Sequence, residues 1–252
     1  MVKTKLGQHF LIDDAVIQKE LFIAQLTEKD IVLEIGPGKG VLTTALAKKV
    51  KQVIAVELDP VLYQYLVTIL PDNVLLIHND IMKMNWEKLP AFTKVVANLP
   101  YQISSPFTFK LFETDFEKAV LIYQKEFAER MIAPVGSKDY SRLTVGISYK
   151  ASCCIHEIIP PKSFSPPPDV HSAIVELIPY KTPPFMVVDE TFFYELTNLL
   201  FSHRRKQIQT ILKKHFSQKL PESIPFTSSR VETLTPEEIA LLSNQLYSYL
   251  HE

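Results

Sequence analysis

The chain has 252 residues, of which 46% are hydrophobic and 22% charged, and its formal net charge is −1. This composition is typical of a globular protein with a buried core, and it excludes disordered, collagen-like and coiled-coil chains. No apolar run approaches the roughly 18 residues of a membrane span, and the first twenty residues lack the apolar stretch of a secretory signal. The two adjacent cysteines, Cys153 and Cys154, can form neither a disulfide framework nor a zinc site. We therefore expect a cytoplasmic protein without membrane contact.

The first two thirds of the chain alternate between helix and strand patterns. A helix is expected from a cap at Asp13-Asp14 to about residue 26. Short apolar runs predict strands at residues 31–35, 53–57, 74–77, 94–97 and 119–123. Helices are expected between them at residues 41–49, 61–70 and around 107–112. Strands that alternate with helices predict an α/β fold with a parallel sheet covered on both sides.

The pattern changes in the last third. Residues 143–149, 153–159 and 170–178 read as strands without helices between them. The intervening segment 160–168 contains five prolines and is expected to be a stiff, non-helical loop that holds Phe164. Helices are expected at residues 192–201, 206–216 and 235–250. Because Pro183-Pro184 marks the change in composition, we predict a first domain at residues 1–183 and a helical one at 184–252.

Glycine use is concentrated in one turn. The chain has six glycines, where an average composition would give about eighteen, and three of them are Gly36, Gly38 and Gly40. A glycine turn between a buried strand and a helix is typical of nucleotide sites. Val41 breaks the dinucleotide fingerprint, no P-loop sequence follows, and Pro37 removes an N–H that a pyrophosphate would bind. The turn therefore favours a nucleoside with a non-phosphate tail, such as S-adenosylmethionine (SAM), and the alternative is a tight turn without a ligand.

Two carboxylates follow the next two strands. Glu57 ends the strand at 53–57, and Asp80 comes shortly after the strand at 74–77. In a doubly wound sheet both lie at the carboxyl edge beside the glycine turn. Glu57 can accept from both ribose hydroxyls and Asp80 from an adenine amine. The alternative is that each only caps a helix.

The tetrapeptide Asn98-Leu99-Pro100-Tyr101 follows the strand at 94–97. An adenine amine is a poor nucleophile because its lone pair is delocalised into the ring. The Asn98 side-chain oxygen and a main-chain carbonyl can accept both N–H bonds, which favours a pyramidal nitrogen whose lone pair points at a sulfonium methyl. Pro100 rigidifies the turn and Tyr101 offers a face for stacking the base. The alternative is an ordinary turn with a core tyrosine.

Basic residues gather in one segment without acidic neighbours. Between Glu195 and Glu222 lie His203, Arg204, Arg205, Lys206, Lys213, Lys214, His215 and Lys219. Such a patch on a near-neutral chain fits contact with an anionic polymer. A solvated helix surface is the alternative.

Together these motifs resemble the small-subunit ribosomal RNA adenine N6,N6-dimethyltransferase family (KsgA type), and the resemblance includes Gly7-Gln8-His9-Phe10-Leu11 near the start. His9 stands where bacterial members usually have Asn, which looks archaeal. The resemblance implies a Rossmann-like SAM-dependent methyltransferase domain with a small all-helical C-terminal domain that contacts RNA, and no metal. It implies cofactor binding by His9, Leu11, Gly36, Gly38, Gly40, Glu57, Leu58, Asp80, Ile81 and Asn98. It implies catalysis by Asn98, Leu99, Pro100 and Tyr101, with Phe164 opposite Tyr101 around the target base, and RNA contacts by Arg204, Arg205, Lys206, Lys213 and Lys214.

The activity that the resemblance implies is N6,N6-dimethylation of two adjacent adenosines in a hairpin loop near the 3′ end of small-subunit (16S) rRNA. The partner would be the small ribosomal subunit during its biogenesis, and the enzyme a monomer. Unpaired loop adenines can be splayed out into a pocket, whereas paired ones cannot. An assembly factor for which methylation is incidental is an alternative. A methyltransferase acting on DNA or on protein glutamine is another, although those enzymes usually carry Asn-Pro-Pro-Tyr.

Overall fold

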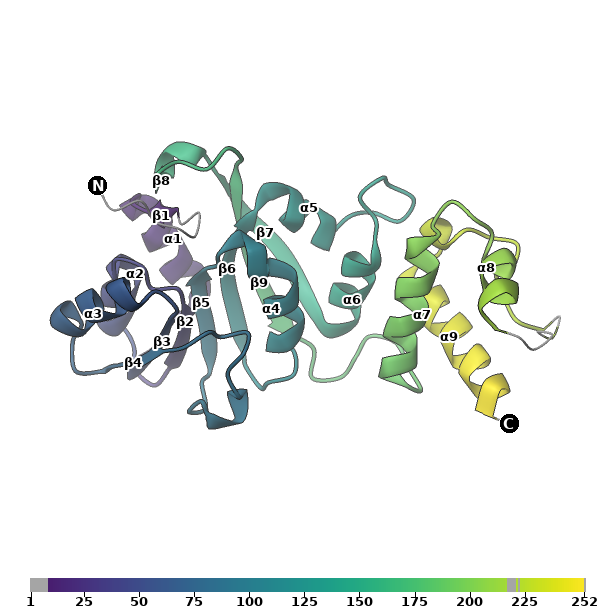
Figure 1. Cartoon of the computed structure of the whole chain (residues 1–252), viewed down its shortest axis with the longest axis horizontal. Helices are drawn as coiled ribbons and strands as arrows, with labels where there is room; N and C mark the ends of the chain where they lie inside the picture. Colours follow the sequence, from purple (N-terminus) through teal and green to yellow (C-terminus); the bar gives the residue numbers. More distant parts are fainter. Residues whose placement is uncertain (1–8, 217–220, 222, 252) are drawn as a thin grey trace. The chain divides into compact units, whose positions relative to one another are not determined.

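A computed structural model describes residues 9–216, 221 and 223–251 (Figure 1). The chain divides into two compact units. The first comprises the described residues up to Ala128 together with Cys153–Pro179, and the second comprises Glu129–Ser152 together with the described residues from Tyr180 onward. The helical unit therefore takes in a segment that precedes the expected boundary at 183/184 as well as the chain after it. No helix within the described residues is both long and apolar enough to cross a membrane.

The first unit is built on a seven-stranded sheet. Its strands are β2 (Ile31–Ile35), β3 (Gln52–Glu57), β4 (Val74–His78), β5 (Lys94–Asn98), β6 (Lys118–Gln124), β7 (Ala151–Ile159) and β9 (Ser172–Pro179). Their order is β4-β3-β2-β5-β6-β9-β7, and the strands from β4 to β6 can be followed across Figure 1. The pairs among β2, β3, β4, β5 and β6 are parallel, whereas β9 runs antiparallel to β6. The prediction of a parallel, Rossmann-like sheet is confirmed.

Helices alternate with the parallel strands. They are α1 (Asp14–Ala24), α2 (Val41–Ala47), α3 (Pro60–Ile69), α4 (Ser104–Leu111) and α5 (Lys125–Met131). Asp13 begins α1 by accepting the N–H of Ala15, and Asp59 begins α3 by accepting those of Val61 and Leu62. Side chains from α1 and α2 share one apolar core with β2, β3, β5, β6 and β9. This packing holds the strand ends at which the polar side chains lie.

The second unit is helical. It contains α6 (Arg142–Lys150), α7 (Glu190–Ser202), α8 (Ile208–His215), the 3₁₀ turn η4 (Val231–Thr233) and α9 (Pro236–His251). Their apolar faces form a separate core that includes Phe193, Leu200, Leu212 and Leu246.

The strand expected at residues 143–149 is wrong, because this segment is α6. Its apolar residues alternate as in a strand, but the helix is buried on several sides, so its burial pattern does not show the 3.6-residue period. The Thr144 hydroxyl accepts the Ser141 N–H at 3.2 Å, a local bond that favours a helix start.

The proline-rich segment is not entirely a loop. It contains a 3₁₀ turn, η3 (Pro161–Ser163), where the missing N–H of a first-turn proline costs nothing, so the expectation of no helical turn is wrong. The next two residues, β8 (Phe164–Ser165), pair antiparallel with β1 (Phe10–Leu11) in a two-stranded sheet. The segment that contains Phe10 and Leu11 is thereby joined to the proline-rich segment.

Candidate active site

The glycine turn connects β2 to α2. Gly36, Gly38 and Gly40 all have positive φ, at 67°, 59° and 77°, a region that side chains with a Cβ rarely adopt. A Cβ on Gly38 would lie 2.8 Å from Cδ1 of Phe10, and one on Gly40 would lie 2.9 Å from Cδ2 of Leu66. The turn therefore needs glycine both for its backbone path and because the Phe10 ring and α3 approach it closely.

Glu57 ends β3 beside this turn. Its side chain is 3% exposed; Oε2 accepts the Gly38 N–H at 3.1 Å and Oε1 accepts the Asp59 N–H at 2.8 Å. Burial raises the pKa of this carboxyl, and the two N–H bonds offset part of that rise. Each oxygen keeps a second acceptor position. Glu57 can therefore accept hydroxyl protons from a ribose while it holds the glycine turn in place.

The segment after β4 forms the next part of the wall. The Asp80 N–H is held by Oδ1 of Asn79 at 2.8 Å, and Asp80 Oδ1 accepts the Met82 N–H at 2.9 Å. Its other oxygen lies 3.6 Å from the exposed Lys83 ammonium. Ile81 is buried and Leu58 is half exposed. A carboxylate beside apolar side chains suits an adenine ring, which has an apolar face and an amine at its edge.

Asn98 is the last residue of β5, and its side-chain oxygen is buried without a hydrogen-bond partner among the described residues. A buried acceptor left without a donor is costly, so this oxygen points to a missing N–H group. Tyr101 begins the 3₁₀ turn η2 (Tyr101–Ile103) and is half buried. Its hydroxyl lies 2.7 Å from Oγ of Ser172, and burial raises its pKa, so it is a neutral phenol near pH 7.

The N-terminal segment and the proline-rich segment meet beside these groups. The His9 ring stacks on Tyr101 with centroids 6.0 Å apart, and its Nδ1 lies 2.8 Å from the carbonyl oxygen of Pro166. The Ile12 N–H donates to the Ser163 carbonyl at 2.9 Å. Phe164 is only 4% exposed. These bonds tie the two segments together.

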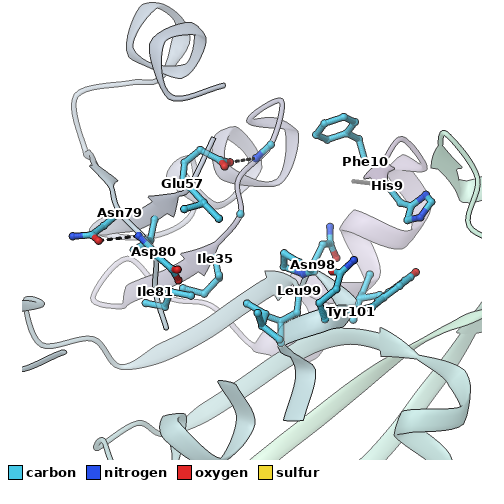
Figure 2. Close-up of a pocket in the computed structure, with 18 of the residues that line it drawn as sticks. His9, Phe10, Ile35, Glu57, Asn79, Asp80, Ile81, Asn98, Leu99 and Tyr101 are labelled. Atoms are coloured by element: carbon cyan, nitrogen blue, oxygen red, sulfur yellow. Dashed lines mark hydrogen bonds between the residues drawn. The ribbon is translucent and has the colours of Figure 1, made fainter. Parts of the chain in front are cut away.

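All of these groups surround one cavity of about 480 Å³ in the first unit, a size typical of small-molecule sites. Figure 2 shows Glu57, Asp80 and Ile81 along one side and Asn98, Leu99 and Tyr101 along the opposite side, with Phe10 and His9 above them. The cavity is lined by these predicted residues: His9, Gly36, Gly38, Glu57, Leu58, Asp80, Ile81, Asn98, Leu99, Pro100, Tyr101 and Phe164. The remaining acceptor positions of Glu57, Asp80 and Asn98, together with the apolar wall, fit a nucleoside with a short charged tail.

Two predicted cofactor residues do not line this cavity. Gly40 packs against α3, and Leu11 lines a small adjacent cavity of about 50 Å³ beneath the turn. Phe10, which belongs to the N-terminal motif of the resemblance, also lines the cavity, whereas sequence reasoning missed Asn79, the neighbour of Asp80. That reasoning also missed the apolar side chains Ile35, Val56, Ile103 and Ile122 and the polar Gln102. Gly7 and Gln8 lie outside the described residues.

Two further carboxyls, one on α1 and one on β2, are buried, and neither was among the predicted site residues. Glu20 on α1 is fully buried, and neither of its oxygens has a hydrogen-bond partner among the described residues; Glu34 on β2 is 2% exposed. Burial raises the pKa of Glu34 to about 8. Burial, and then the nearby Glu34, raises the pKa of Glu20 well above its ordinary value. Glu34 also lines the small cavity together with Asn98. A glutamate on an amphipathic helix ordinarily predicts an exposed position, so no sequence signal indicated the burial of Glu20. Glu34, by contrast, lies in the run 31–35, which was expected to be a buried strand.

The predicted RNA-binding residues lie in the second unit and differ in their surroundings. Arg204 is half buried: its Nε donates to Glu232 at 2.7 Å, and its two terminal nitrogens donate to the carbonyls of Lys138 and Ser137. The other four predicted residues are exposed, namely Arg205, Lys206, Lys213 and Lys214. Within the described segment these four can reach a phosphate backbone, whereas Arg204 is already bound within the protein.

Comparisons with known proteins show what the whole chain is similar to. The family model described as Ribosomal RNA adenine dimethylase matches residues 1–247. A Methanosarcina acetivorans protein named "Probable ribosomal RNA small subunit methyltransferase A" is 44% identical, with 95% of this chain and 92% of that protein covered. A crystal structure of a dimethyladenosine transferase from Plasmodium falciparum superposes with a TM-score of 0.80 at 29% identity and covers 96% of this chain and 98% of that one. The 23S rRNA methyltransferase ErmE superposes with a TM-score of 0.70 at 26% identity, with 94% and 99% covered.

Proposed function

The chain belongs to the ribosomal RNA adenine dimethylase family, whose members are SAM-dependent rRNA adenine dimethyltransferases, and we propose that its target is two adjacent adenosines in a hairpin loop near the 3′ end of small-subunit rRNA. Each adenosine receives two methyl groups on N6. The reaction accompanies small-subunit biogenesis in the cytoplasm, with the enzyme acting as a monomer. The observation that carries this proposal is the buried, unpartnered oxygen of Asn98 at the end of a nucleoside-sized cavity.

The residues around the cavity fit SAM, which supplies an electrophilic sulfonium methyl when bound. Glu57 accepts the ribose hydroxyls, and its bond to Gly38 keeps the turn beneath them. Asp80 would accept a hydrogen bond from the adenine amine, and Ile81 and Leu58, which line the same cavity, would pack against the ring. The methionine part belongs near the glycine turn and Phe10. No residue on this side needs to change its protonation during the reaction.

The target base belongs on the side of Asn98 and Tyr101. The Asn98 oxygen accepts an N6–H of the adenine, which satisfies the buried acceptor and turns the nitrogen lone pair toward the methyl group. Tyr101 stacks on the base as a neutral phenol, and Phe164 supports the base from the proline-rich segment. A strong general base is unnecessary, because the alkylated ammonium releases its proton readily. The monomethylated amine keeps one N–H for Asn98, so the same geometry serves the second transfer.

The choice of substrate among rRNAs is tested by competition. Unmethylated small subunits and large subunits are incubated together with the enzyme and labelled SAM, and the nucleosides of each rRNA are then separated. We expect N6,N6-dimethyladenosine in the small-subunit rRNA only, at two positions. Label in 23S rRNA alone would instead assign the chain the substrate that the name of ErmE indicates.

The role of Asn98 is tested in the same assay. Asn98→Ala should lower turnover by about a hundredfold or more, the scale of one lost positioned transition-state contact, while SAM binding measured by calorimetry persists. Asn198→Ala is the matched control, because that side-chain oxygen accepts from Arg142 in the second unit. Wild-type turnover by Asn98→Ala would remove Asn98 from the mechanism. Loss of methylation with intact subunit binding would separate catalysis from an assembly role.

A further inference from the structure

Tyr101 stands on an irregular part of the chain. It begins a three-residue 3₁₀ turn directly after Pro100, and the N–H of Ile103 donates to the Pro100 carbonyl at 3.1 Å. Neither a long helix nor a strand holds its backbone, and the side chain is only half buried. The contacts of the side chain therefore bear directly on how the ring is held.

The hydroxyl of Tyr101 is held by a residue of the sheet. Ser172 is the first residue of β9 and is fully buried, and its Oγ lies 2.7 Å from the tyrosine hydroxyl oxygen. Ser172 pairs with Gln124 on β6, whereas Asn98 pairs with Ile122 on the other side of the same strand. Because these two partners are two residues apart, Ser172 and Asn98 both lie next to the C-terminal end of β6, on the two strands that flank it.

The bond does more than satisfy a buried hydroxyl. Tyr101 lines the cavity, and a phenylalanine would pack the same ring there without needing a hydrogen-bond partner. The bond also fixes the distance between the Tyr101 ring and β9, the strand of Ser172. Because β9 and the strand of Asn98 both pair with β6, the ring is thereby held relative to Asn98. The His9 ring, stacked at 6.0 Å, gives the same tyrosine a second point of support.

We propose that Ser172 is a positioning residue for the methyl transfer: its hydroxyl fixes the Tyr101 ring so that the stacked adenine presents N6 to Asn98. This inference rests on the proposed function and adds to it a residue that never touches SAM or RNA. The step itself is unchanged; Ser172 neither gains nor loses a proton. Ser172 contributes by orienting the Tyr101 ring. Its loss should therefore lower kcat and leave the Kd for SAM unchanged.

The test is a double-mutant cycle with Ser172→Ala, Tyr101→Phe and the double variant. One net hydrogen bond between neutral groups corresponds to about a three- to tenfold change in rate. We expect each single variant to lower kcat by about that factor with the Kd for SAM unchanged, and the double variant to be no slower than Tyr101→Phe. A control removes a similar bond elsewhere: Thr108 Oγ1 lies 2.6 Å from the hydroxyl of the fully buried Tyr123, outside the cavity. Thr108→Val should lower the melting temperature and leave kcat unchanged.

A second readout is independent of methyl transfer. A hairpin RNA with 2-aminopurine at the target position reports stacking on Tyr101 through quenching of its fluorescence. Ser172→Ala should weaken this quenching, and Thr108→Val should not. Wild-type kcat and quenching in Ser172→Ala, or independent effects in the cycle, would overturn the positioning role while leaving the proposed function intact. A wild-type enzyme that neither methylates nor quenches would refute the proposed function and this inference with it.

Discussion

Gly38→Ala tests whether the N-terminal segment rests on the glycine turn. Alanine would have to adopt a φ of 59°, and its Cβ would lie 2.8 Å from Cδ1 and 3.0 Å from Cε1 of Phe10. The positive φ alone costs about 1 kcal/mol of unfolding free energy. The clash is relieved when the Phe10 ring moves away, and the ring then loses its contact with the Lys39 ammonium, now 5.1 Å from its centroid.

The two costs appear in different measurements. If the displaced ring no longer buries on the order of 50 Å² of apolar surface against the bound cofactor, the binding free energy of SAM weakens by about 1.3 kcal/mol, at about 25 cal/mol per Å². That corresponds to about a tenfold rise in the Kd for SAM. Gly136→Ala is the control, because Gly136 has a φ of 81° with no atom within 4 Å of its Cβ. Urea unfolding should show a similar loss of stability in both variants, whereas calorimetry should show weaker SAM binding in Gly38→Ala only.

A second substitution sharpens the result. Phe10→Ala removes the ring that the new Cβ meets, so adding Gly38→Ala to it should cause little further loss of SAM affinity. An unchanged Kd in Gly38→Ala, with stability lowered as in Gly136→Ala, would show that Phe10 does not close over the bound cofactor. The interpretation of the N-terminal segment as part of the cofactor site would then be wrong.

Two further predictions concern buried and exposed charge. Because burial raises the folded-state pKa of Glu34 to about 8, this carboxyl stays protonated in the folded chain while it ionises in the unfolded chain, and stability falls progressively between pH 4.5 and 8, by about 3 kcal/mol at pH 7. Glu20, whose pKa is also raised, acts in the same direction. Glu34→Gln should therefore be more stable than the wild type at pH 7 and equal to it below pH 4. A difference in unfolding free energy that stays the same from pH 4 to pH 7, measured by urea unfolding, would contradict that. Arg205→Ala should weaken RNA binding and flatten its dependence on salt, with SAM binding unchanged. Arg204→Ala should chiefly lower the melting temperature, because it breaks the ion pair with Glu232, and equal effects of the two arginine variants on RNA affinity would refute this division.

The strand-end residues could be predicted because each follows a short buried strand. Glu57, Asp80 and Asn98 come after the apolar runs of β3, β4 and β5, and parallel strands bring such residues to one edge. The glycine turn was predictable for the same reason. These features depend on local pattern and on one topological rule, and both are visible in the sequence.

Other features depend on partners that are distant in the chain. Arg204 and Arg205 are neighbours in a basic run, yet Arg204 is bound by Glu232 and two carbonyls, whereas Arg205 is exposed. Ser172 is 71 residues from Tyr101, and nothing about a serine at a strand start indicates that contact. Segment 143–149 was predicted as a strand because a helix buried on several sides loses the period that distinguishes it. In each case the deciding contact is tertiary, and composition carries no trace of it.

The pairing of β1 with β8 bears on how the two substrates are received. Phe10 packs on the glycine turn, and Leu11 pairs with Phe164, so this strand contacts both the side of the cavity proposed for the cofactor and the side proposed for the target base. His9 contacts Tyr101 through its ring and the proline-rich segment through its Nδ1. A movement of this strand therefore changes both sides of the cavity together. The proposed cofactor and base sites are therefore coupled through one two-stranded sheet, because the same pairing of β1 with β8 supports residues on both sides of the cavity.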